Sequence, residues 1–182
     1  MNQRDVVTTI AKVLILALLA GCAITNAGTI PEVPETLKVP ATQVLSLETQ
    51  ATGVQIYKCK ASKHDPMRFE WVFKAPEAVL TDNTGKMIGR HYAGPTWESN
   101  DGSKVVGEVR AQDSGPDPNS IPWLLLSAKS TSGNGAFGLT HSIQRLRTSG
   151  GKAPAAGCDH AQVDKEIRVP YKAVYYFYID RP

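Results

Sequence analysis

The chain has 182 residues, of which 42% are hydrophobic, and a formal charge of +3. This length and composition fit one globular domain with an ordinary core. The 15 glycines and 12 prolines favour a turn-rich fold over long helices. The basic residues are scattered, so nucleic acid is not an expected partner. Arg145 and Arg147 come closest to a basic cluster, and we interpret them as part of a solvated face.

The first 21 residues predict an export signal. Residues 13–19, VLILALL, form an apolar run that follows Arg4 and Lys12. This run is too short to span a bilayer as a stable helix, which is typical of a signal peptide. Asp5 is unusual in a region that is normally positively charged.

A possible lipid attachment site comes directly after this signal. The sequence Leu19-Ala20-Gly21-Cys22 resembles the lipobox of bacterial lipoproteins, which implies cleavage before Cys22 and a membrane anchor through lipid on its thiol. Ala23, where inner-membrane lipoproteins carry Asp, implies the outer membrane. The alternative is cleavage near residues 25–27, which would release a soluble periplasmic or secreted protein.

The cysteine count fits this interpretation. Three cysteines are an awkward number for an exported protein, but lipidation of Cys22 leaves Cys59 and Cys158 as a pair in an oxidising compartment. Cys158 and His160 alone are a weak zinc signal, since no second pair lies nearby. We therefore predict a disulfide between Cys59 and Cys158, with no metal and no other cofactor.

The rest of the chain predicts a proline-rich tether followed by strands. Residues 22–40 contain three prolines and no periodicity, which predicts an extended tether, and residues 41–182 then form the folded domain. In residues 171–179 the alternation places Tyr171, Tyr175 and Phe177 on one face, which predicts a core strand. Regularly spaced short strands with turn signals predict an all-β fold, a single-domain antiparallel β-barrel or β-sandwich with long Gly/Pro-rich loops.

Residues 88–107, IGRHYAGPTWESNDGSKVVG, hold the best candidate site. Asp101-Gly102 predicts a two-residue hairpin loop in which Ser99 faces Lys104 and Trp97 faces Val106. Strand alternation then places Trp97 and Glu98 on opposite faces. The candidate ligand-binding residues are His91, Trp97, Glu98 and Asp101, with Trp123 and His141 in reserve.

Catalytic signatures are weaker than these binding features. The chain has no G-x-S-x-G motif and no paired histidines, so we assign no catalytic residue. Glu98 or His91 could serve in acid–base chemistry, but neighbouring carboxylates also occur on solvated hairpins. His141 shares a strand face with Ile143 and Arg145, and that strand is either partly exposed or lines a wet interior.

An ordered series of short motifs runs through the domain. The pieces are GVQIYKC at 53–59, His91 with GPTWE at 94–98, DGS at 101–103, IPWLL at 121–125, IQR at 143–145, TSGG at 148–151, AP at 153–154, CD at 158–159 and YKA at 171–173. Over about residues 40–179 the chain resembles the exported domain-of-unknown-function family 3455 of bacteria and fungi. The resemblance implies an exported domain and supports the Cys59–Cys158 pairing. It brings no established activity, so it carries over no catalytic residue.

Three hypotheses about function follow. The first is a non-enzymatic envelope lipoprotein that binds a small or envelope ligand. The second is a hydrolase or isomerase that uses Glu98 or His91 as general base, which requires titratable groups that converge in a pocket. The third is a purely structural surface protein, for which an interior filled by side chains would be the sign. The oligomeric state stays open.

Overall fold

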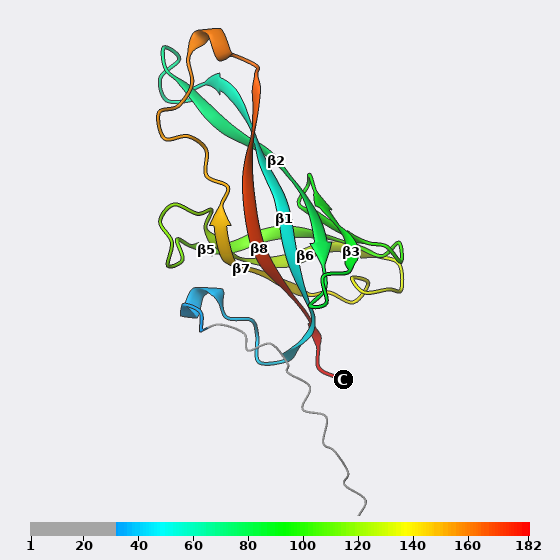
Figure 1. Ribbon diagram of the computed structural model, residues 1–182. Coiled ribbons are helices and arrows are strands. Elements are labelled where there is room, and N and C mark those ends of the chain that lie inside the picture. Colours follow the sequence, from blue (N-terminus) through cyan, green and yellow to red (C-terminus); the bar gives the residue numbers. More distant parts are fainter. Residues whose placement is uncertain (1–31) are drawn as a thin grey trace, which may run out of the picture.

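Each strand of the protein pairs antiparallel with its sequence neighbours, and the last strand returns to pair with the first (Figure 1). The computed structural model describes residues 32–182, so the predicted signal peptide, Cys22 and the start of the tether lie outside the described residues. The strands are β1 Gln43–Ala61, β2 Phe69–Thr81, β3 Met87–Tyr92, β4 Thr96–Ser99, β5 Lys104–Asp113, β6 Trp123–Ser132, β7 Ser142–Gly150 and β8 Glu166–Asp180. The all-β prediction is confirmed, and closure of the sheet gives a barrel.

Helical structure is confined to two short turns in this part of the chain. They are the 3-10 helices η1, Glu35–Leu37, and η2, His160–Gln162. Within residues 32–182, no helix is long and apolar enough to cross a membrane.

Strand β1 is longer than the alternation patterns predict. Its 19 residues pair with both β2 and β8. The sequence predicts separate strands at 44–47 and 53–60, but buried Thr49 and Ala51 continue the alternation between them. Register shifts at Leu45/Leu47 and Ile56/Tyr57 let this long strand bend with the barrel. Together β1, β2 and β8 extend past the shorter strands (Figure 1).

The predicted disulfide is confirmed, and it fastens this extension. Cys59 of β1 is bonded to Cys158, which lies in the long loop between β7 and β8. Cys158 also forms a β-bridge with Phe69 at the start of β2. The loop is therefore tied to β1 and β2, two of the three strands of the extension.

The interior core follows the alternation of β8. Tyr171, Ala173, Tyr175 and Phe177 are all at most 3% exposed and belong to the main apolar cluster, as the sequence predicts. The residues between them point outward, yet Tyr176 and Tyr178 are also buried.

The N-terminal segment covers that outer face. Leu37 of η1 is fully buried in a second cluster with Tyr176 and Tyr178. The Gln144 amide donates to the Leu37 carbonyl at 2.6 Å and accepts from the Tyr178 hydroxyl at 2.6 Å. Within the predicted tether, residues 33–39 thus include a segment that packs on the barrel.

The β4–β5 hairpin has a different register from the predicted one. Trp97 pairs with Val105 and Glu98 with Lys104, so the loop contains three residues, 100–102. Gly102 closes it with a φ of +87°, a conformation that glycine adopts freely. The Asp101 carboxylate favours this loop by accepting from the Ser103 amide and hydroxyl. The prediction that Trp97 and Glu98 lie on opposite faces is confirmed: Trp97 is buried inside the barrel, and Glu98 lies on the outer face.

Candidate functional site

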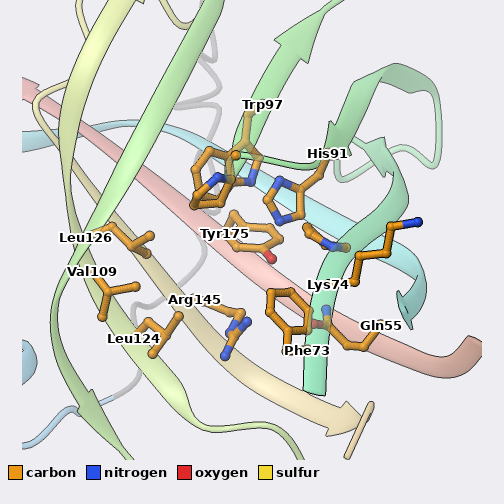
Figure 2. Close-up of a pocket in the computed structure, with 13 residues that line it drawn as sticks. Gln55, Phe73, Lys74, His91, Trp97, Val109, Leu124, Leu126, Arg145 and Tyr175 are labelled. Atoms are coloured by element: carbon orange, nitrogen blue, oxygen red, sulfur yellow. The ribbon is translucent and has the colours of Figure 1, made fainter. Parts of the chain in front are cut away.

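A cavity of about 350 Å³ lies inside the barrel and opens at its side (Figure 2). The short β3–β4 hairpin explains the opening. β2 pairs with β3 only from Ala78 to Thr81, and β4 pairs with β5 only as far as Val106, so no strand separates β2 from β5 beyond these points. Pro76, which has no N–H to leave unpaired, occupies the open edge of β2. Phe73 and Val109, both about half exposed, border the mouth.

The wall of the cavity is mostly apolar. Its apolar members are Phe73, Pro76, Gly94, Pro95, Trp97, Val109, Leu124 and Leu126, and its polar members are Gln55, Lys74, His91, Arg145 and Tyr175. Pockets of about 300–1,000 Å³ with apolar walls and a few polar groups are typical small-molecule sites.

Three aromatic rings form the inner end of the cavity. His91 and Trp97 are direct partners on β3 and β4, and their rings stack with centroids 4.3 Å apart and planes 13° apart. The Tyr175 ring meets both edge-on, at 5.1 Å from His91 and 5.2 Å from Trp97 (Figure 2). Gly107 makes room for this cluster, because a Cβ there would lie 2.9 Å from Trp97 Cζ3.

His91 is a neutral hydrogen-bond acceptor at neutral pH. Burial lowers its pKa to about 3. Its Nδ1 lies 2.9 Å from the Thr96 carbonyl, and since a carbonyl can only accept, Nδ1 carries the proton. Nε2 is therefore the acceptor of the ring.

Several buried polar atoms around the cavity lack partners among the described residues. Trp97 Nε1, Gln55 Nε2 and the hydroxyls of Tyr175 and Tyr171 form no hydrogen bond there. The two tyrosines lie close enough to influence each other, and burial is the main reason that both pKa values are raised. An unpaired buried polar group costs about 1–3 kcal/mol. A bound molecule with suitable acceptors would remove this cost.

Arg145 points into the barrel from β7. It shares the inner face with fully buried Ile143 and is itself half-buried, so the predicted solvated face is wrong for this residue. Its Nε and Nη2 donate to the Pro122 carbonyl at 3.1 and 2.8 Å. Sequence reasoning missed Gln55, Arg145 and Tyr175 as site residues. The one available signal for Arg145 was its place on the same face as Ile143.

Of the candidates named from sequence, the fold brings His91 and Trp97 together. Glu98 lies on the outer face, where the Tyr92 hydroxyl at 2.8 Å and Arg90 at 3.0 Å lower its pKa. His91 and Glu98 sit on alternate faces, because His91 pairs with Trp97 while Arg90 pairs with Glu98.

The other three candidates lie away from the cavity wall. Asp101 joins two loops by accepting from Ser103 and the Ala136 amide, contacts that lower its pKa to about 2. Trp123 packs in the outer cluster with Leu37. His141 is exposed and lies 3.5 Å from Asp180. A ligand-binding role for these residues stays a prediction.

No group of three or more His, Cys, Asp or Glu side chains in residues 32–182 is arranged to hold a metal ion. The groups that line the cavity are instead aromatic rings, neutral donors and the basic side chains of Lys74 and Arg145.

Fold and cavity together define a disulfide-linked antiparallel β-barrel with an aromatic-walled interior site. The chain belongs to the family described as "Protein of unknown function (DUF3455)", which matches residues 40–179. This confirms the family resemblance seen in the sequence. No curated protein and no solved structure matches the chain.

Proposed function

We propose that this protein is a non-enzymatic binding module that holds a small apolar or aromatic molecule inside its barrel. The observation that carries the proposal is the aromatic-walled cavity in which Trp97 Nε1, Gln55 Nε2 and the Tyr175 hydroxyl lack partners within residues 32–182. Neutral donors in an apolar pocket fix the orientation of a ligand while the wall supplies most of its contact area.

The other two hypotheses find less support. A structural role predicts an interior filled by side chains, whereas the barrel has a cavity of about 350 Å³. Acid–base catalysis needs converging titratable groups, but Glu98 and His91 occupy opposite faces. His91, with a pKa of about 3, is also a poor base near neutral pH.

We also propose that lipid on Cys22 anchors the barrel to the outer membrane. The support comes from the sequence, in which a signal sequence is followed first by the lipobox-like residues 19–22 and then by the folded domain. Growth with a labelled fatty acid tests this. The chain should incorporate label and fractionate with the outer membrane, and Cys22→Ser should abolish both. A chain that is never labelled contradicts the anchor, leaves release by ordinary cleavage, and does not affect the binding proposal.

The binding proposal is tested with N-phenyl-1-naphthylamine, a neutral aromatic probe whose fluorescence rises in apolar surroundings. The full-length protein with its disulfide intact should enhance the probe's fluorescence saturably. Val109→Trp narrows the mouth at a half-exposed position and should weaken binding at least tenfold.

Two variants serve as controls. Val79→Trp places the same side chain at a similarly exposed position that is not part of the cavity wall, and it should bind like wild type. Glu98→Gln changes the outer face one residue from Trp97 and should also be neutral. If Val109→Trp binds the probe as tightly as wild type, the probe binds outside the cavity. If wild type does not bind the probe at all, the proposal is contradicted.

A further inference from the structure

From the charges around the cavity we infer that its ligand is an anion, a carboxylate or chemically similar group on an apolar body, which Arg145 binds through its guanidinium. This inference rests on the proposed binding function and narrows it to one ligand class.

The acidic and basic residues of the cavity wall are unequal in number. Two basic side chains, Arg145 and Lys74, contribute to it, and no Asp or Glu does. Lys74 is already paired with Glu166 at 2.6 Å, outside the cavity wall. Arg145 has no carboxylate within 4.0 Å in the part of the chain that the structure describes. A positive charge therefore borders the cavity without a carboxylate counter-ion from residues 32–182.

The hydrogen bonds of Arg145 leave part of its donor set available. A guanidinium has five N–H bonds, and two of them converge on the Pro122 carbonyl. This double contact restrains the orientation of the guanidinium, and Figure 2 shows the Arg145 side chain among the residues that line the cavity. The remaining three N–H bonds have no carbonyl or carboxylate partner within residues 32–182. Their planar fork suits the two oxygens of a carboxylate.

The influence of this charge reaches the other polar groups of the site. Burial is the main reason that the pKa of His91 is lowered, and the charge of Arg145 adds to this effect. Burial raises the pKa of Tyr175, and Arg145 opposes this rise through its charge and through its proximity to the Tyr175 hydroxyl. Because His91 is neutral, the site provides one cation, Arg145, besides the lysine that already has a partner. The amide of Gln55 and the indole N–H of Trp97 are further donors in residues of the cavity wall, and neither has a partner among the described residues.

The rest of the wall selects the body of the ligand. The stacked rings of His91 and Trp97, with Leu124 and Leu126 across the cavity, offer contact to carbon and no counter-charge (Figure 2). A molecule with one anionic end and an apolar body would satisfy both parts of this wall. A molecule with two separated charges would bury one of them against the apolar part of the wall, where it would have no partner.

Two matched probes test the inference: 2-naphthoate and 2-naphthamide, which share their ring system and differ in charge. Titration calorimetry on the full-length protein at pH 7 should show that the naphthoate binds at least about tenfold more tightly than the naphthamide. The reason is that the amide cannot form the charge-assisted bidentate contact with Arg145. Arg145→Met should remove this preference and leave naphthamide binding within a few-fold of wild type. Arg145→Lys keeps the charge and should keep a reduced preference.

The matched control is Arg110→Met, which removes the same charge from the exposed outer face of β5 and should leave the preference unchanged. Equal binding of both probes to wild type overturns the anion inference while the binding function stands. Binding of neither probe, together with failure of the naphthylamine test, contradicts the binding function itself. The wild-type comparison holds even if Arg145→Met proves too unstable to titrate.

Discussion

His91 and Trp97 lie opposite each other on two short strands and stack inside the barrel with ring centroids 4.3 Å apart. The adjacent pair, Arg90 and Glu98, forms an ion pair on the outside at 3.0 Å. The inner face of the β3–β4 hairpin therefore forms the aromatic end of the cavity, and its outer face carries a solvated network of polar side chains.

The burial of His91 predicts acid sensitivity. In the unfolded chain its pKa returns to about 6.5, whereas the folded value is about 3, so below pH 6.5 the unfolded state binds a proton that the folded state does not. Stability from this residue is complete above pH 6.5 and is lost as the pH falls toward 3. Between pH 7 and pH 4.5 this loss is about 2–3 kcal/mol.

Urea unfolding of His91→Gln at several pH values measures this contribution. The variant should be less stable than wild type at pH 7, and the gap should narrow by pH 4.5, because glutamine takes up no proton. His141→Gln, at the surface, should follow the wild-type curve. Parallel pH curves for wild type and His91→Gln would show that His91 does not titrate as its burial implies.

Much of this fold could be predicted from alternation and turn chemistry. The strand at 171–179, the opposite faces of Trp97 and Glu98, and the Cys59–Cys158 bridge all depend on local pattern or on the cysteine count. The register of the hairpin at 100–102 differs from the predicted one, because Asp101-Gly102 suits a two-residue loop as well as the three-residue loop that forms. In the folded chain the Asp101 carboxylate accepts from Ser103 and also from the Ala136 amide, 35 residues further along the chain.

The cavity itself lay beyond sequence reasoning. Gln55, Arg145 and Tyr175 come from three strands, and closure of the sheet alone brings them to one space. Period-two patterns show which side chains of a strand share a face. They do not show that the β3–β4 hairpin is too short to cover the side of the barrel.

A methyl group at Gly107 should disturb the aromatic cluster. The added Cβ would lie 2.9 Å from Trp97 Cζ3 and 3.1 Å from Leu126 Cδ2, so the indole must shift. We expect Gly107→Ala to lower the free energy of unfolding by about 1–3 kcal/mol, the usual effect of overpacking. Tryptophan fluorescence should change, and naphthylamine binding should weaken. Wild-type stability with unchanged fluorescence would mean that the ring has more room than its contacts indicate.

Removal of the disulfide should destabilise the fold without closing the cavity. The bridge joins residues 99 positions apart, and loop-closure entropy alone gives about 4–5 kcal/mol for such a loop, an upper figure. The double variant Cys59→Ala/Cys158→Ala should have a lower urea midpoint and should no longer respond to reductant, whereas wild type should. Neither cysteine contributes to the cavity wall, so the probe affinity of the folded variant should persist. Equal midpoints for wild type with and without reductant would contradict this.

The contact between the N-terminal segment and the barrel should depend on Gln144. Its amide joins the Leu37 carbonyl to the Tyr178 hydroxyl beneath the covering segment, and all three residues are buried. Gln144→Leu leaves both partners unpaired, at about 1–3 kcal/mol for each. Hydrogen exchange of the Leu37 and Lys38 amides should accelerate, because the 3-10 turn that protects them would detach more often. Leu37→Ala is the matched comparison, since it removes the apolar contact and keeps the Gln144–Tyr178 bond. Unchanged exchange in Gln144→Leu with acceleration in Leu37→Ala would assign the docking of this segment to apolar packing alone.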